Sequence, residues 1–385
     1  MTDHTPRREF LAAAAAAGAA LAAGASAETR ISFAPRTPAS RELVKVGVVL
    51  GRWTHTKNIW HAYTNPSAGT PRRTGMIITH YWTFWNDVVE DFEKKTGATR
   101  VKNLADMIGK VDGVIVDEAH AITLQHLAAK PYLESGIPTF INRPFSSSMK
   151  KAKMMVEIAR KNGTPIMSAS SFEYLKEAIA ARKLVDRKKI LAYEAHNASS
   201  DYYTHGLHGI WFAYTCVGGG VSRIGTMARK WWSGPALTYI EHEPRFEGGQ
   251  PVYGVVRHGA TAGGNCGIRV YGSEGFLGLP QYVVFDNGPE GTVWARDMSL
   301  WTPMLIAMEE MFETGKMPEP YEDILEKTRI FLASLYSLME LNGGLVEMSR
   351  FPDDWDGGPL TPEHYPDNSY SPAELKEYER ALAGA

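Results

Sequence analysis

The chain has 385 residues, of which 44% are hydrophobic and 22% charged, and its formal net charge is -2. These fractions are typical of a globular protein, and the length allows two domains of ordinary size. The charge leaves no basic excess for a phosphate backbone, so we expect no nucleic-acid partner. No apolar run after Ala27 approaches the roughly 20 residues of a membrane helix, so we expect no membrane span in the mature protein. Two cysteines, Cys216 and Cys266, permit one disulfide but no disulfide framework.

The first residues predict an export leader. Arg7 and Arg8 are followed by an alanine-rich apolar run that ends at Ala25-Ser26-Ala27. A charged segment, an apolar segment and an A-x-A cleavage site make a signal peptide, and the paired arginines indicate the twin-arginine type. We expect residues 1–27 to be removed, residues 28–42 to be a linker, and the mature protein to work in the periplasm or outside the cell.

Strands and helices alternate at short spacing in residues 43–167. This rhythm predicts βαβ units and a doubly wound parallel sheet, the Rossmann-like type of α/β domain. The expected strands are 43–50, 76–79, 111–116, 138–142 and 165–169, and the expected helices are 86–95, 121–133 and 147–161.

Residues 168–346 predict a second domain of α+β type with an open, mainly antiparallel sheet, because strand-like runs follow one another with few helices between them. The expected strands are 190–195, 221–228, 251–258, 266–271 and 282–285, and the expected helices are 175–185, 206–215 and 321–346. Residues 347–385 are expected to form an arm. Ser371, Pro372 and Glu374 are typical of a helix start, so the arm should end in one short helix.

Several short motifs resemble one known family. They are Val111-Asp112-Gly113-Val114, Asn142-Arg143-Pro144, Gly206-Leu207-His208, Gly272-Ser273-Glu274-Gly275 and Asn342-Gly343-Gly344. Over residues 43–346 the chain resembles the glucose-fructose oxidoreductase, inositol dehydrogenase and MocA (Gfo/Idh/MocA) family. The resemblance implies an NAD- or NADP-dependent dehydrogenase of a carbohydrate or polyol, with a nucleotide-binding domain before a substrate domain that often mediates homo-oligomers.

The glycine-rich nucleotide fingerprint of that family is absent. A dinucleotide site needs glycines after the first strand, so that backbone amides can approach the pyrophosphate. Here Gly47 and Gly51 remain, but Leu50 and Arg52 stand where the first two fingerprint glycines belong. A nicotinamide cofactor would therefore need a remodelled site.

The residues that the resemblance assigns to such a cofactor site include an arginine and an aromatic side chain in unusual places. Arg52 carries a charge that suits phosphate or carboxylate, and an aromatic side chain replaces the usual acidic residue after the second strand. The full set is Gly47, Gly51, Arg52, Trp82, Asn142 and Arg143.

Two further departures fall beside the expected nicotinamide position. Asp117 and Glu118 replace a small residue and a proline; Glu118 is either a catalytic acid or base, or a solvated side chain beside a helix-capping Asp117. Arg143 replaces the family's lysine. Arginine stays protonated, so Arg143 is expected to orient a substrate or to stabilise an anion, or to be a structural residue at a strand end.

A group of histidines lies between residues 194 and 208. The resemblance places His208 over the substrate, as catalytic acid or base, with Tyr203 or His205 as its partner. Alternatively, Glu194, His196, His205 and His208 converge on a metal such as zinc, since Glu194 and His196 share a strand face, and His205 and His208 a helix face. In a third interpretation the histidines only satisfy hydrogen bonds.

Three functions follow from these observations. The first is an exported Gfo/Idh/MocA-like oxidoreductase acting on a sugar or polyol derivative. The second keeps the fold without a nicotinamide: a lyase or hydrolase on carbohydrates that uses Glu118 with His205 and His208, with or without a metal. The third is a carbohydrate-binding protein without activity.

The twin-arginine prediction can be tested by replacing Arg7 and Arg8 with lysine. We expect the wild-type protein to accumulate outside the cytoplasm and to begin at Glu28, whereas the double variant stays in the cytoplasm at full length, because the export machinery reads the arginine pair. Cell fractionation with mass spectrometry of the N-terminus measures both, and Arg30→Lys in the linker is the control. Wild-type protein that keeps Met1 inside the cell contradicts the prediction.

Overall fold

A computed structural model describes residues 42–384 except 71, 119, 185–188, 198–201, 231–232, 246–248, 260–264, 273–274, 279–281, 284–299, 360 and 364–368. The predicted leader and nearly all of the predicted linker lie outside the described residues, and so does the second half of the strand expected at 282–285. All structural statements below concern the described residues.

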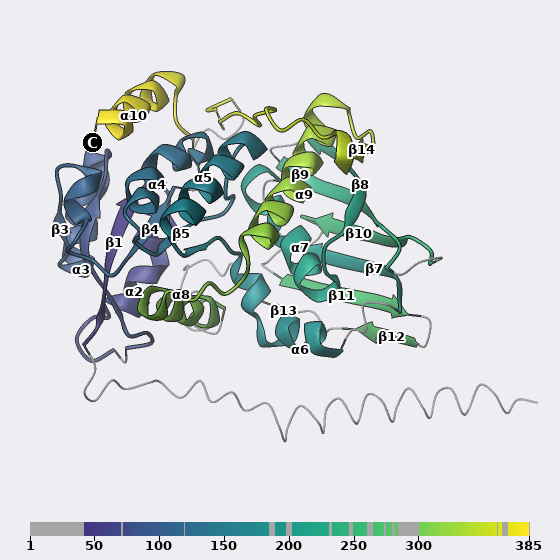
Figure 1. The fold of residues 1–385 in the computed structure, drawn as a ribbon, viewed down its shortest axis with the longest axis horizontal. Coiled ribbons are helices and arrows are strands. Elements are labelled where there is room, and N and C mark those ends of the chain that lie inside the picture. The colour runs from purple at the N-terminus through teal and green to yellow at the C-terminus, as the bar shows by residue number, and fades with distance from the viewer. Residues whose placement is uncertain are drawn as a thin grey trace, which may run out of the picture. The chain divides into compact units, whose positions relative to one another are not determined.

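Six parallel strands form the first sheet, in the order β3-β2-β1-β4-β5-β6. Figure 1 labels β3, β1, β4 and β5 of this sheet. The β1 strand is buried almost throughout, as expected of a β-branched strand covered on both faces. The sheet confirms the doubly wound α/β domain. Its strands are β1 (Val44–Leu50), β2 (Met76–Trp82), β3 (Thr99–Arg100), β4 (Gly113–Asp117), β5 (Thr139–Ile141) and β6 (Ile166–Met167).

The helices of this domain begin and end close to the predicted positions. Gly97 and Gly163 follow α3 and α5 in the left-handed conformation, which glycine adopts without steric cost, so both helices end where the sequence predicts. The helices are α2 (His61–Thr64), α3 (Val89–Thr96), α4 (Gln125–Glu134) and α5 (Met149–Asn162), and the shorter turns of helix are η1 (Thr56–Trp60), η2 (Asn86–Val88), η3 (Leu104–Met107) and η4 (Ile122–Leu124).

The second sheet is mixed and mainly antiparallel, in the order β12-β11-β7-β10-β9-β8-β14, with β13 paired to β11. Only the pair of β7 and β10 is parallel among the described pairs, so the sheet confirms the predicted α+β domain. The strands are β7 (Ile190–Asn197), β8 (Val221–Lys230), β9 (Ser233–His242), β10 (Val252–His258), β11 (Asn265–Gly272), β12 (Gly275–Gly278), β13 (Tyr282–Val283) and β14 (Val346–Glu347). The sequence had not predicted β9.

Helices cover one face of the second sheet. Helix α7 packs on β7 and β10, and α9 packs on β8 and also on α5 of the first domain. The prediction of a helix over 321–346 was wrong at its C-terminal end: α9 ends at Glu340, because Asn342 and Gly343 adopt positive φ angles of 49° and 89°. This group comprises η5 (Ser171–Tyr174), α6 (Lys176–Leu184), α7 (Tyr202–Val217), α9 (Tyr321–Glu340) and η7 (Met348–Arg350).

Two later helices return to the first domain. Helix α8 (Thr302–Thr314), which the sequence had not predicted, packs on β1, and its Phe312 covers Gly113 of β4. Helix α10 (Pro372–Gly384) is the predicted C-terminal helix and contacts α4 (Figure 1). Its start has the predicted capping box, in which the Ser371 amide donates to Glu374 and the Glu374 amide to the Ser371 hydroxyl.

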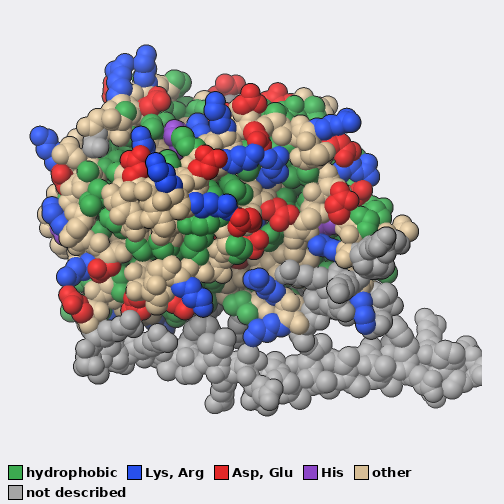
Figure 2. Space-filling view, viewed as in Figure 1, with side chains coloured by type: hydrophobic (Ala, Val, Ile, Leu, Met, Phe, Trp, Pro, Cys, Tyr) green, Lys and Arg blue, Asp and Glu red, His purple; other side chains and the backbone are tan. Residues whose placement is uncertain are grey.

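The surface and the cysteines bear on the composition-based expectations. Lys and Arg side chains are interspersed with Asp and Glu over the face in Figure 2. Cys216 and Cys266 are both buried, and no disulfide joins them. Within the described part of the chain, no helix combines the length and apolar character needed to cross a membrane.

The contact between Gly113 and Phe312 predicts a stability effect. A Cβ at position 113 would overlap the Phe312 ring, so Gly113→Ala should lower the free energy of unfolding by about 1–3 kcal/mol. Adding Phe312→Leu should recover part of this loss, because the smaller side chain gives room. Urea unfolding of the single and double variants measures the coupling. Gly384→Ala, where a Cβ meets open space, is the control; equal losses in Gly113→Ala and Gly384→Ala would refute the packing argument.

Candidate functional site

The strand order of the first sheet reverses between β1 and β4. In open α/β sheets, ligands bind outside the carboxyl ends of the strands at such a switch point. Here β1 ends at Leu50 beside Asp117 of β4, and the Gly51 amide donates to the Asp117 carbonyl oxygen over 3.1 Å. The residues that follow these two strands therefore form the candidate site.

Asp117 holds the turn after β1 in place. Its Oδ2 accepts from the Thr56 amide at 2.7 Å, and its Oδ1 accepts from the Asn142 side-chain amide at 2.6 Å. Burial raises the pKa of the Asp117 carboxyl, while these hydrogen bonds oppose the shift. The idea that Asp117 caps the helix after β4 was wrong, because its carboxylate faces η1 across the switch point.

Glu118 is buried, with 1% of its surface exposed, so the solvated alternative was wrong. The Tyr370 hydroxyl lies 3.1 Å from both of its carboxyl oxygens, and the His120 and Ala121 amides lie 3.3 Å from Oε1. Burial raises the pKa of Glu118 to about 7, although its hydrogen bonds act in the opposite direction. The carboxyl group also fills the space over Gly51, where a Cβ would lie 2.7 Å from Glu118 Cδ.

These contacts do not fit a dinucleotide bound in the usual way. A pyrophosphate is held by backbone amides at the turn after the first strand. In this chain Gly51, Arg52 and Thr56 already donate their amides to the Asp117 carbonyl, the Tyr370 hydroxyl and the Asp117 carboxylate. The Glu118 carboxyl occupies the adjacent space and, when ionised, would repel a phosphate.

The other residues predicted to bind a cofactor have different contacts. Gly47 lies inside β1, where a Cβ would meet Met107 and Val114, so this glycine allows close packing within the core. Arg52 pairs with Asp87 at 3.1 Å and with Glu374 of α10 at 3.2 Å, so its charge is already matched by carboxylates.

The Trp82 side chain is covered rather than open to a ligand. Its Nε1 donates to the Lys102 carbonyl oxygen, and its ring stacks near Tyr378 of α10. Only 5% of Trp82 is exposed. It therefore offers no free aromatic face at the end of β2.

Arg143, Asn142 and His55 form a polar cluster beside the switch point. The Arg143 guanidinium donates to the Thr204 carbonyl oxygen at 3.0 Å and lies 3.1 Å from His55 Nε2. The Asn142 side-chain amide lies 3.1 Å from His55 Nδ1. Burial, followed by the positive charge of Arg143, lowers the pKa of His55 well below its usual value, so His55 is neutral at neutral pH.

Helix α7 brings His208 and His205 to the same region. Ser170 Oγ lies 2.6 Å from His208 Nδ1, and Phe172 packs edge-on against the imidazole, so the ring is fixed and Nε2 is the nitrogen that remains to exchange a proton. Burial lowers the pKa of His208 well below its usual value, with a further contribution from Arg143. The His205 ring lies 5.7 Å from the His208 ring. The neutral imidazole of His208 can accept a proton at neutral pH.

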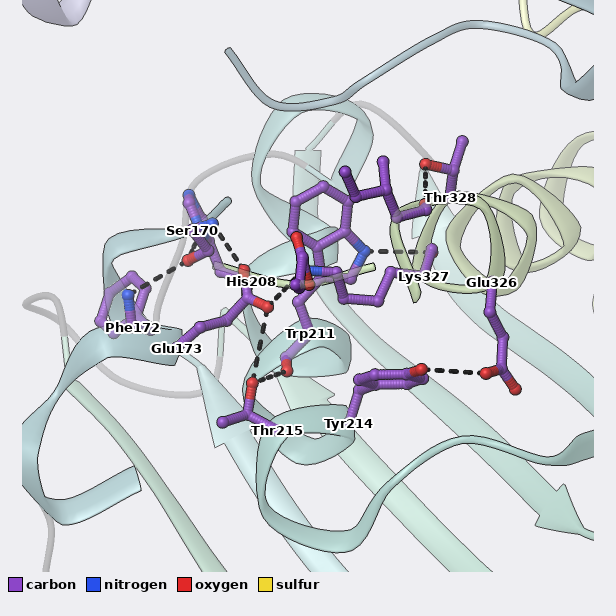
Figure 3. A network of polar contacts seen from close by, with 12 residues as sticks. Ser170, Phe172, Glu173, His208, Trp211, Tyr214, Thr215, Glu326, Lys327 and Thr328 are labelled. Atoms are coloured by element: carbon purple, nitrogen blue, oxygen red, sulfur yellow. Dashed lines mark hydrogen bonds and ion pairs between the residues drawn. The ribbon is translucent and has the colours of Figure 1, made fainter. Parts of the chain in front are cut away.

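A buried ion-pair network holds Ser170 behind His208 (Figure 3). The Ser170 amide donates to Glu173 Oε2 at 2.7 Å, while Glu173 Oε1 lies 2.7 Å from Lys327 Nζ. Lys327 is 1% exposed, pairs also with Glu319, and lies over the Trp211 ring. Because breaking a buried pair leaves an uncompensated charge, this network keeps Ser170, and through it His208, in one position.

The proposed metal ligands do not come together. Tyr193, Ala195 and Asn197 of β7 are buried, and a Cβ at Gly209 of α7 would contact the Asn197 side chain, so Glu194 and His196 alternate onto the opposite face of the sheet. Glu194 pairs there with Arg257 at 2.7 Å. The hypothesis that Glu194 and His196 join His205 and His208 around a metal was therefore wrong. Among the described residues, no group of three or more His, Cys, Asp or Glu is arranged to hold a metal ion.

Tyr203 lies on α7 but points toward the tail. Its hydroxyl donates to the Gly358 carbonyl oxygen, and the side chain is fully buried. Burial raises the pKa of Tyr203, so the phenol stays protonated. Its role as the acid/base partner of His208 remains a prediction.

Sequence reasoning missed several residues of the cluster. His55 follows the turn that contains Gly51, and His120 follows Glu118. Only the fold shows that the two histidines face the same region. The His120 ring lies 5.7 Å from Trp53, and Trp301 lies 5.0 Å from His55 although it precedes a helix some 240 residues later. A histidine a few residues after a strand end was the one available signal for His55 and His120.

Comparison with known proteins gives matches in structure but not in sequence. The sequence matches no protein-family model and no curated protein. A probable dehydrogenase from Thermotoga maritima is 15% identical, with a TM-score of 0.62, over 80% of this chain and 99% of the other. A myo-inositol dehydrogenase from Lactobacillus casei, in complex with NAD(H) and myo-inositol, is 15% identical, with a TM-score of 0.64, over 79% of this chain and 96% of the other.

A third similar structure is an oxidoreductase from Agrobacterium radiobacter in complex with NAD+, L-tartaric acid and magnesium. It is 15% identical, with a TM-score of 0.61, over 80% of this chain and 99% of the other. Two of these structural neighbours are dehydrogenases and the third is an oxidoreductase, and the fold expected from the Gfo/Idh/MocA resemblance is confirmed. At such low identity the likeness extends to the fold alone.

The raised pKa of Glu118 predicts a pH effect on stability. The folded chain keeps a proton on Glu118 up to a pH of about 7, whereas in the unfolded chain it leaves near 4.5, so the free energy of unfolding should fall as the pH rises between these values. The fall amounts to at most roughly 3 kcal/mol.

The comparison of wild type with Glu118→Gln isolates this effect, because both proteins share the titration of the buried histidines. Urea unfolding at several pH values between about 4.5 and 7.5 measures it, and the exposed Glu90→Gln is the control. The wild-type curve should lose stability relative to Glu118→Gln as the pH rises. Parallel curves for the two proteins would refute a raised pKa.

Proposed function

We propose that this protein is an exported enzyme that acts on a sugar or polyol derivative by acid–base chemistry, without transferring hydride to a nicotinamide. The observation that carries the proposal is the site itself: His55, His205 and His208 surround the buried Arg143, while the turn that would receive a dinucleotide is filled by the chain's own Glu118 and Tyr370. Fold, domain order and the small-molecule ligands of the structural neighbours support the substrate class.

His208 is the general base of this proposal. Its Nδ1 is engaged by Ser170, its ring is neutral, and its Nε2 accepts a proton from a carbon next to a carbonyl or carboxylate group. The electron pair of the broken C–H bond passes into the carbonyl or carboxylate. When a leaving group departs from the next carbon, a double bond forms, which is the reaction of a lyase.

Arg143 stabilises the anion that this step generates. A guanidinium stays protonated in proteins, and in a buried site it stabilises a developing negative charge more than it would in water. Arg143 is 5% exposed, and its position is fixed by Thr204 and His55. Arginine is a poor proton donor, so the protonated His208 returns its proton, either to the substrate carbon or to the leaving group.

A second candidate is an NAD- or NADP-dependent oxidoreductase with a remodelled site. The structural neighbours, several of them solved with NAD(H), favour this function. It requires that the Glu118 and Tyr370 contacts open to admit the dinucleotide. Turnover that depends strictly on added NAD or NADP would establish this candidate and refute the first.

The test uses deuterium exchange at substrate carbon. Mature protein is incubated in D₂O with sugar and polyol derivatives that carry a carbonyl or carboxylate group, with and without NAD(P), and the products are analysed by mass spectrometry. We expect deuterium incorporation or elimination without a nicotinamide. His208→Ala should lower the rate by roughly 10²–10⁴-fold, because the general base is lost.

His196→Ala is the matched control, since this histidine lies on the opposite face of the second sheet and should leave the rate unchanged within about twofold. The proposal fails if His208→Ala exchanges substrate deuterium as fast as wild type. It also fails if no derivative exchanges while one of them is bound, since that outcome would indicate a carbohydrate-binding protein.

A further inference from the structure

Residues 369–384 lie beside the carboxyl ends of β1, β2 and β4 in the first domain, although they are the last described residues of the chain. These residues are the last part of the arm predicted at 347–385, and we refer to residues 369–384 alone as the C-terminal arm. Tyr370 and Tyr378 are fully buried, and Leu382 is 5% exposed, so the arm is part of the core rather than an appendage on its surface. Helix α10 also contacts α4.

Tyr370 occupies the centre of the switch point. Its hydroxyl donates to the Glu118 carboxyl and accepts from the Arg52 amide over 3.2 Å. Its ring lies parallel to Trp85, with centroids 4.5 Å apart and an angle of 3°, and also packs against Trp53 at 4.9 Å. The Tyr370 hydroxyl thus provides a hydrogen-bond partner for the Arg52 amide in the turn after β1, and the ring packs among aromatic side chains.

The rest of the arm continues these contacts along the ends of the strands. Tyr378 lies 5.5 Å from Phe84 and stacks near Trp82 after β2. Glu374 pairs with Arg52, whose guanidinium lies 4.3 Å above the Trp85 ring. The positions after β1 and β2, which hold the pyrophosphate and the ribose in dinucleotide-binding domains, are both covered by residues of the arm.

We propose that the C-terminal arm is a permanent intramolecular occupant of the nucleotide site, which closes the site to dinucleotides and completes the core of the first domain. Three observations combine in this assignment: buried tyrosines of the arm, the turn amides already bonded within the chain, and a buried carboxyl group in contact with Gly51. Release of the C-terminal arm would leave polar groups of the turn without partners. The free-energy cost of these unpaired groups opposes opening of the site.

Hydrogen exchange measured by mass spectrometry tests the proposal on the mature chain without any substrate. Amides of the arm helix should exchange as slowly as those of β1, and millimolar NADH or NADPH should leave both unchanged. Faster exchange of the arm upon addition of either dinucleotide would overturn the proposal, because it shows a displaceable plug. Rapid exchange of the arm in the protein alone would also overturn it, because the arm would then not be seated.

Variants of Tyr370 distinguish the packing of the C-terminal arm from the overall stability of the protein. Tyr370→Phe keeps the ring stack but loses one hydroxyl, so exchange of the arm should rise only about fivefold. Tyr370→Ala should release the arm and lower the unfolding temperature, while the exposed Lys376→Ala changes neither. If Tyr370→Ala leaves both exchange and unfolding temperature as in Lys376→Ala, the arm is not part of the core. Failure of the carbohydrate reaction would not affect these measurements.

Discussion

The two carboxyl groups at the end of β4 are the constraint on which the candidate site depends. Asp117 and Glu118 are both buried, and burying carboxyl groups is costly unless each has hydrogen-bond partners. Asp117 finds them in Thr56 and Asn142, and Glu118 finds one in Tyr370. These bonds join the turn after β1, the end of β5 and the C-terminal arm around the switch point of the sheet.

The same arrangement divides the site into two parts with different chemistry. Glu118 and the C-terminal arm fill the space over Gly51 on one side of Asp117, so that side is closed and aromatic. On the other side, Asn142 positions His55 beside Arg143, and α7 contributes His205 and His208. The neutral imidazoles of His55 and His208 beside a guanidinium favour proton transfer on an anionic or carbonyl-containing substrate. The fold of a dehydrogenase therefore does not by itself define the chemistry of this chain.

The residues that hold His208 in position come from distant parts of the sequence. Glu173 lies three residues after Ser170 and closes the capping box of η5, whereas its ion-pair partner Lys327 lies on α9. Burial raises the pKa of Glu319, although the ammonium group of Lys327 opposes the shift. Two carboxyl groups on one buried ammonium form a rigid support, because no member can move without leaving a charge unpaired.

Local chemistry in the sequence was enough for most of the elements, although it missed β9 and α8 and placed the end of α9 too late. Strand-like runs of β-branched residues, Gly97 and Gly163 after helices, and the Ser371 capping box predicted the strands, helix ends and domain types, because these signals act over a few residues. The missing glycine fingerprint was also visible in the sequence. The convergence of His55 with Arg143, the separation of Glu194 and His196 from His208, and the burial of Glu118 under Tyr370 were decided only by the tertiary structure. Each depends on sheet order, strand face or contacts between residues far apart in the chain, and no local pattern encodes these relations.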